Sequence, residues 1–189
     1  MSSDKFWEEI SNCLEQSRKE LHARWAAWTL DPAKLEVHET LGALMARQVT
    51  LFTQMASNPG IWNGHVAPLL LRSMVDTYIT FAWTLQDKES RSRLFIYHGL
   101  GQEKLHLEHF KAALSESGEE VDDHPFVEAI TNWIDSQRWT FLTDVNLGSW
   151  SGKSTRAMAE EANCMDIYNH AYHPFSAAVH GMWNHVAKY

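Results

Sequence analysis

Two charged residues, Arg72 and Asp76, lie in a stretch that is otherwise almost wholly apolar (LLLRSMVDTYITFAWTL, residues 69–85). A full charge among apolar neighbours costs several kcal/mol unless it is paired and hydrogen-bonded. Asp76 follows Arg72 by one helical turn, so it is the nearest partner that the sequence offers. If the pair forms a site, we expect Arg72 to hold an anion and Asp76 to orient it.

Four further residues recur at every fourth position near the end of the chain: Tyr168, Tyr172, Ser176 and His180. At about 100° per residue they form a line that turns slowly around a helix and brings His180 to the edge of the apolar face. We predict that Tyr172, Ser176 and His180 line a polar pocket together with Arg72. His180 is the candidate general acid or base, because imidazole exchanges protons near neutral pH. Ser176 can act as a nucleophile only if His180 reaches it.

The alternative is a purely structural role for the same residues. The two tyrosines would then pack in the core, and Ser176 and His180 would lie at a helix margin, where polar residues are common. The Arg72 network would fix the register of the helices, as buried polar groups can do. The protein would then be a non-enzymatic interaction or scaffold module.

Together these residues resemble the pattern of a family of microbial helical proteins known only as a domain of unknown function. The matching positions are Arg72-Ser73-x2-Asp76, then Trp150, a short helix, and Tyr168-x3-Tyr172-x3-Ser176-x3-His180-Gly181. The resemblance runs from residue 69 to the C-terminus. The chain departs from the pattern at Asp76, where glutamate is commoner, and this shortens the reach to the arginine.

More distantly, the pattern is similar to the HEPN superfamily of helical nucleotide-binding and ribonuclease domains, many of which act in toxin or phage-defence systems. This similarity implies RNA or a nucleotide as the ligand, by analogy alone. The HEPN ribonuclease signature, Arg-x4–6-His, occurs as Arg93 to His98 and as Arg91 to His98. In a chain with 11 histidines such matches arise by chance. Leu94 also replaces the polar residue that usually follows the arginine, so we do not assign catalysis there.

A phosphate-binding loop is suggested by residues 148–155 (GSWSGKST). The loop is one residue too short for a P-loop, and no strand is predicted before it. A weaker alternative stays open, in which Lys153 and Arg156 flank a helix N-terminus capped by Ser154 and hold one phosphate or carboxylate. A solvated loop with an ordinary helix cap is the simpler interpretation.

Metal ligands are numerous but poorly arranged. Helical histidine pairs occur at His106-x2-His109 and His170-x2-His173. Glu103-x2-His106 has the spacing of di-iron bundles, but these need a second such motif and further carboxylates. The two cysteines, Cys13 and Cys164, suit neither a zinc site nor a disulfide framework, and we expect reduced thiols. We predict no metal and no cofactor.

The elements that position these residues are all predicted to be helices. Apolar residues recur at helical spacing throughout, and no strand pattern competes. We predict an all-α fold in one domain (residues 1–189), a bundle of five to seven helices with a long N-terminal helical hairpin. The expected helical ranges are 4–30, 35–56, 62–86, 90–115, 125–140, 154–163 and 165–188, the last with a break or kink at Pro174. The irregular residues 141–153 could form a lid.

Charge and hydropathy limit the location and the partners. The net charge of −8 argues against an extended nucleic-acid footprint, although a nucleotide or a short RNA is not excluded. The longest apolar run is far short of the roughly 18 residues that a spanning helix needs, and the N-terminus has no signal-peptide pattern. We therefore expect a cytoplasmic protein without a membrane span. A homo-oligomer is expected, since homodimers are common among soluble helical proteins of this size.

Overall fold

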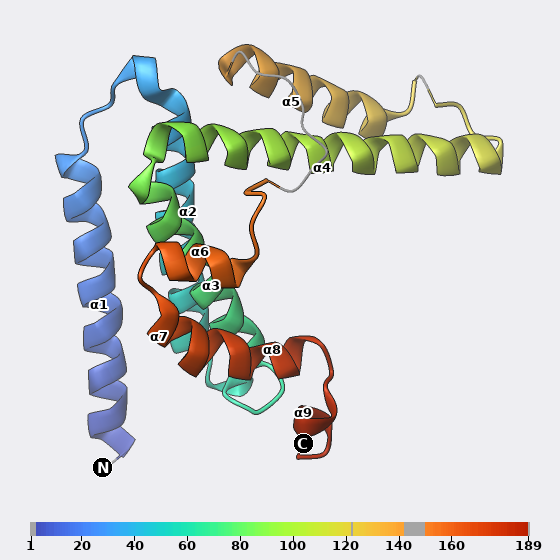
Figure 1. Ribbon diagram of the computed structural model, residues 1–189. Coiled ribbons are helices and arrows are strands. Elements are labelled where there is room, and N and C mark those ends of the chain that lie inside the picture. The colour runs from blue at the N-terminus through green and yellow to red at the C-terminus, as the bar shows by residue number, and fades with distance from the viewer. Residues whose placement is uncertain (1–2, 122, 142–149, 189) are drawn as a thin grey trace. The chain divides into compact units, whose positions relative to one another are not determined.

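The computed structural model describes residues 3–121, 123–141 and 150–188. These residues form helices and no strand, which confirms the predicted all-α class (Figure 1). By their contacts the residues group into two compact units. Unit 1 comprises residues 1–31, 41–86 and 154–189, and unit 2 comprises residues 32–40 and 87–153. The single domain stays a prediction.

Unit 1 begins with the expected helical hairpin. Helix α1 (Ser3–Ala27) and helix α2 (Leu35–Ala56) run antiparallel, and residues 41–56 of α2 belong to this unit (Figure 1). The two helices come close near the end of α1, where a Cβ atom added to Gly42 would lie 2.6 Å from Cη2 of Trp25. Glycine is therefore needed at position 42 for the indole to keep its place.

The central helix, α3 (Ala67–Gln86), begins five residues later than predicted. After the 3-10 turn η2 (Pro59–Ile61), the side chain of Asn63 turns the chain by accepting hydrogen bonds from the N–H groups of His65 (3.0 Å) and Val66 (2.9 Å). An Asx turn of this kind competes with helix formation. Helix α3 then buries Thr77, Ile79, Trp83 and Thr84.

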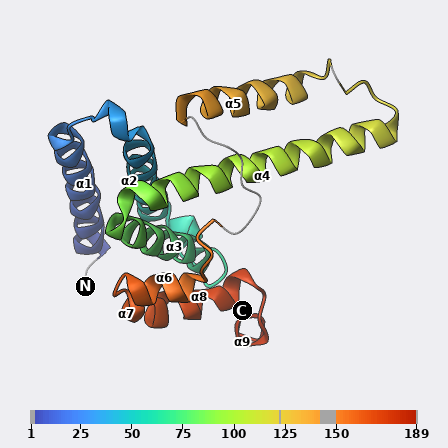
Figure 2. The ribbon, with the colours of Figure 1, turned by 45° about the horizontal axis from the view of Figure 1, so that its top comes forward.

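Two short helices pack against α3 in unit 1, α6 (Thr155–Glu161) and α8 (His173–Val179) (Figure 2). The N-cap of α6 is Ser154, as predicted, and its hydroxyl oxygen accepts from the N–H of Ala157 at 3.2 Å. The apolar core of the unit includes residues from α2, α3, α6 and α8: Leu41, Leu44, Ile79, Trp83, Met158, Ala159 and Ala177.

The C-terminal stretch is one helix with a π-helical middle, followed by a short separate helix. It consists of α7 (Met165–Ile167), the π-helix η3 (Tyr168–Tyr172), α8 and α9 (Trp183–Val186). Pro174 lies in the first turn of α8 and is preceded by the π-turn, because proline has no N–H for the α-helical bond. The helix breaks later than predicted, at Gly181, whose φ of 57° suits glycine.

Unit 2 contains the 3-10 turn η1 (Pro32–Lys34), the first residues of α2, α4 (Lys88–Ser117) and α5 (Pro125–Phe141). Helix α4 starts at the N-cap Asp87 and ends at Gly118, which has a φ of 76°. Helix α5 runs back along α4 (Figure 2), and the two bury a shared core of Leu107, Leu114, Val127 and Ile134. The suggested lid of residues 141–153 lies mostly outside the described residues.

None of the helices in the described ranges combines the length and the apolar character that a bilayer crossing requires.

Candidate functional site

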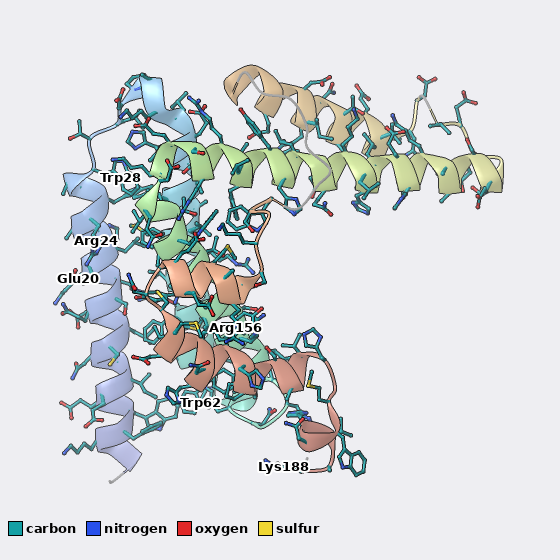
Figure 3. The ribbon with its side chains drawn as sticks, in the orientation of Figure 1. Glu20, Arg24, Trp28, Trp62, Arg156 and Lys188 are labelled. Carbon is teal, nitrogen blue, oxygen red and sulfur yellow. The ribbon has the colours of Figure 1, made fainter. Side chains whose placement is uncertain are left out.

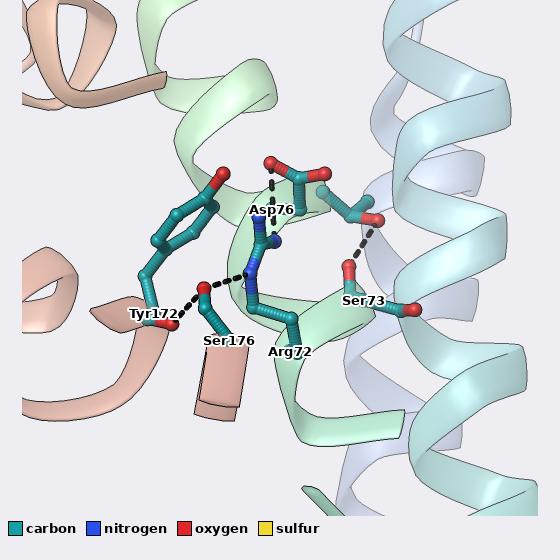
Figure 4. A network of polar contacts seen from close by, with 6 residues as sticks. Arg72, Ser73, Asp76, Tyr172 and Ser176 are labelled. Carbon is teal, nitrogen blue, oxygen red and sulfur yellow. Dashed lines mark hydrogen bonds and ion pairs between the residues drawn. The ribbon is translucent and has the colours of Figure 1, made fainter. Parts of the chain in front are cut away.

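Arg72 lies at the interface of α3 and α8 in unit 1 and meets the partner that its sequence position predicts. Its side chain is only 13% exposed, and its Nη1 lies 3.4 Å from Oδ1 of Asp76, which is 47% exposed (Figure 4). The Nε–H donates to the hydroxyl oxygen of Ser176 at 3.0 Å. The distance of 3.4 Å is long for a charge-assisted hydrogen bond. Asp76 is therefore an ion-pair partner of the guanidinium that forms no short hydrogen bond with it.

A tyrosine covers one face of the guanidinium. Cζ of Arg72 lies 3.1 Å from the centroid of the Tyr172 ring, which is the arrangement of a cation–π contact. The ring of Tyr168 stacks on that of Tyr172, with centroids 4.8 Å apart and an angle of 18° between the planes. Both tyrosines belong to the π-helix η3. Three planar groups thus lie together beside α3: a guanidinium and two phenol rings.

The hydroxyl of Ser176 is fully engaged. Its oxygen accepts from Arg72, and its hydrogen is donated to the carbonyl oxygen of Tyr172 at 2.7 Å (Figure 4). A backbone carbonyl cannot take up a proton as a general base does. In this arrangement Ser176 anchors the guanidinium to α8, and none of the described residues is placed to activate it as a nucleophile.

His180 lies apart from this cluster. It is the residue at which α8 ends, its N–H donates to the carbonyl of Ser176 at 3.0 Å, and its side chain is exposed. Among the described residues no contact joins the His180 side chain to Arg72. The structure thus brings together Arg72, Asp76, Tyr172 and Ser176, and places His180 one turn further along α8.

The guanidinium keeps hydrogen-bonding capacity. An arginine side chain has five N–H donors in a planar fork. The Nε–H is taken by Ser176, and Nη1 forms an ion pair with Asp76. In the described part of the chain no acceptor engages the other three. Anions such as phosphate and carboxylate match this fork geometry.

Other contacts that hold α3 in place were not predicted from the sequence. The indole Nε1–H of Trp83 donates to Oε2 of Glu161 at 2.7 Å, and the side-chain amide of Gln86 donates to the Glu161 carbonyl at 2.6 Å. Trp83 is 2% exposed, so its N–H needs an acceptor. That need was visible in the sequence, but the identity of the acceptor, in a short helix 78 residues away, was not.

Two further sequence candidates, Arg93 and Arg156, form ion pairs elsewhere. Arg93 of the Arg-x4-His match forms an ion pair with Glu36 at 3.1 Å within unit 2. Arg156, beside the capped end of α6, pairs with Glu160 at 3.1 Å on the exposed side of that helix (Figure 3). Within the described residues no three histidine, cysteine, aspartate or glutamate side chains are placed to hold a metal ion. The absence of a metal and a cofactor stays a prediction.

Both cysteines are free thiols, Cys13 exposed and Cys164 buried. Desolvation raises the pKa of the Cys164 thiol, and a hydrogen bond with Tyr78 opposes this effect. The two thiols therefore differ in reactivity, because the thiolate is the reacting form.

Comparison with known proteins identifies the family of the chain. The model of a family described as a family of unknown function (DUF5677) matches residues 38–189. The matched segment contains all the residues of the Arg72 cluster, while α1 lies outside it. No curated protein and no solved structure matches the sequence.

Proposed function

The chain belongs to the DUF5677 family, and we propose that it binds a small phosphate-bearing ligand of the nucleotide class at Arg72. The observation that carries this proposal is that, within the described part of the chain, the Arg72 guanidinium has unused hydrogen-bond donors although its side chain is largely buried. Its side chain is largely buried, its one carboxylate neighbour is half-exposed at 3.4 Å, and three of its N–H groups have no acceptor among the described residues. A phosphate group supplies the missing acceptors.

The stacked tyrosines support a nucleotide as the phosphate bearer. Bases stack on aromatic side chains, with about 1–3 kcal/mol per base. Tyr172 lies between Arg72 and Tyr168 in one stack, so a base would stack on the outer face of Tyr168. The net charge of −8 favours a single nucleotide or a short RNA end over a long polyanion. The distant resemblance to HEPN domains suggests the same ligand class, and action on RNA in a toxin or phage-defence setting remains part of this proposal.

Each residue of the cluster receives a role. Arg72 binds the phosphate, Ser176 holds Arg72 against α8, and Asp76 orients the guanidinium while competing with the anion for it. Tyr172 covers one face of the guanidinium, and the outer face of Tyr168 would receive the base. If the protein also converts this ligand chemically, His180 is the candidate for proton transfer, because its side chain is exposed one turn beyond Ser176.

A structural role is the second candidate, and the low exposure of Arg72 favours it. A guanidinium that is 13% exposed and bonded across two helices fixes their register whether or not it binds a ligand. This candidate predicts loss of stability, and no loss of binding, when Arg72 is replaced.

Isothermal titration of the full chain with adenosine monophosphate, inorganic phosphate and adenosine separates the two. We expect the monophosphate to bind most tightly. Arg72→Lys keeps the charge but loses the fork, and should weaken its binding about tenfold, which corresponds to about 1.4 kcal/mol. Asp76→Asn removes the competing carboxylate and should strengthen binding.

Arg156→Gln is the matched control, because Arg156 is also an arginine with an acid four residues on, but is exposed on α6. It should bind as the unchanged protein does. The proposal fails if neither phosphate nor the monophosphate binds the unchanged protein. It also fails if Arg72→Lys lowers the thermal midpoint while binding is unaltered, which is the result expected of a structural role.

A further inference from the structure

A second feature of unit 1, separate from the Arg72 cluster, is a cavity of about 630 Å³ among α1, α2 and α3. Its walls on α2 and α3 are mainly apolar and aromatic: Leu44, Met45, Val49, Phe52, Tyr78 and Phe81. Helix α1 closes it with Leu21 and with small or polar side chains. Cavities of roughly 300–1,000 Å³ with such walls are the usual size of small-molecule sites.

Helix α1 covers this cavity without filling it. Of the described side chains in residues 5–27 none is buried, although Leu14 and Leu21 are partly covered. Well-packed cores leave few voids larger than a water molecule. A space of this size under a covering helix is therefore better suited to a ligand than to packing.

The charges on the α1 side of the cavity cancel one another. Arg24 lies 3.5 Å from Glu20, one turn away on α1 (Figure 3), and the amide of Gln16 donates to the same carboxylate at 3.3 Å. These groups leave no unpaired charge to select an ionic head group. The net charge of −8 further disfavours an anion.

We infer that this cavity binds an uncharged, largely apolar small molecule with an aromatic ring. Met45, Phe52, Tyr78 and Phe81 offer the edge and face contacts that aromatic rings prefer. The inference does not depend on Arg72, so it stands or falls separately from the proposed nucleotide site.

Two fluorescent probes of matched shape test the inference on the full chain. N-phenyl-1-naphthylamine is uncharged, and 8-anilino-1-naphthalenesulfonate has the same ring skeleton with a sulfonate. We expect the amine to bind saturably, at least tenfold more tightly than the sulfonate. Val49→Phe, which fills the cavity, should weaken amine binding at least tenfold. Ala113→Phe, which adds the same ring at an exposed position of α4, should not.

Cysteine labelling gives a second readout that needs no substitution. Cys13 is exposed and lines the cavity, whereas Cys164 is buried. Saturating amine should slow the labelling of Cys13 by N-ethylmaleimide at least threefold, as followed by intact mass. If Val49→Phe does not fold, Ser17→Phe replaces it, since Ser17 faces the cavity from α1.

Equal binding of the two probes, unaltered amine binding in the filled variant, or unchanged labelling of Cys13 would each overturn the inference. The first and second results would indicate binding to scattered exposed apolar side chains. The third would place the probe away from α1.

Discussion

Replacing Ser176 with alanine tests whether the hydroxyl really anchors the guanidinium. The change removes the acceptor of the Arg72 Nε–H, a hydrogen bond of 3.0 Å from a charged donor whose side chain is 13% exposed. Hydrogen bonds to charged groups contribute about 1.5–3 kcal/mol. Alanine regains part of this, about 0.5 kcal/mol, through its higher helix propensity.

The net loss should therefore be about 1–2.5 kcal/mol of unfolding free energy. For a chain of this length, that corresponds to a fall in the thermal midpoint of roughly 2–10 °C. Far-UV circular dichroism during thermal and urea unfolding measures it. Ser176→Thr keeps the hydroxyl, so its thermal midpoint should lie closer to that of the unchanged protein.

A double-mutant cycle identifies the partner. If Ser176 acts through Arg72, then Ser176→Ala should cost almost nothing in an Arg72→Met background, and the coupling energy should be about 1–2 kcal/mol. The reasoning is refuted if Ser176→Ala is neutral in the unchanged protein, or if its cost is the same in both backgrounds. Either result would mean that the contact in Figure 4 contributes nothing to folding.

Two further predictions concern unit 2. Gly118, with a φ of 76° at the end of α4, and Gly99, inside α4 with open space around it, should respond oppositely to alanine. Gly118→Ala should destabilise the protein by about 1 kcal/mol or more, and Gly99→Ala should stabilise it by about 0.5–1 kcal/mol. Urea unfolding midpoints measure both effects, and midpoint shifts of the same sign would contradict the prediction. A hydrogen bond from Lys34, followed by the attraction of its charge, lowers the pKa of Glu89 below its usual value. The stability that this pair contributes is present above the unfolded-state pKa of Glu89 and is lost as pH falls through its lowered folded-state pKa. The difference in unfolding free energy between the unchanged protein and Glu89→Gln should therefore shrink in acid. A difference that grows with acidity would contradict the assignment.

Local sequence signals predicted the positions of several elements well. The range 35–56 was predicted correctly, because Pro32 stands just before the helix and the run Ser57-Asn58-Pro59-Gly60 stops it. Ser154 was correctly identified as a helix cap. The start of α3 was predicted too early, since the apolar residues of positions 61–66 fit a helix equally well and the Asx turn at Asn63 decides otherwise.

Two of the boundaries between the units have no counterpart in the composition. One boundary falls within α2, after Thr40, and another falls at Asp87, between α3 and α4, with no glycine or proline run. At these two boundaries the units are defined by the spatial proximity of residues and not by linker-like residues. Periodicity reports which face of a helix is apolar, but it does not say which helices share a core.

The candidate site was predicted from the every-fourth-residue spacing of Tyr168, Tyr172, Ser176 and His180. The positions of these side chains differ from the prediction where the C-terminal helix is not a regular α-helix. A line of every fourth residue drifts in one direction on an α-helix. In the π-turn of residues 168–172 each residue advances through a smaller angle, so the drift is turned back and the two tyrosine rings stack. Ser176 then resumes the α-helical step and meets Arg72. His180 would continue the line, but Gly181 ends the helix beside it. A glycine directly after a histidine at the end of an apolar pattern is a common helix stop, so this part of the outcome could have been read from the sequence. The π-turn could not, because proline at position 174 is equally compatible with a kink.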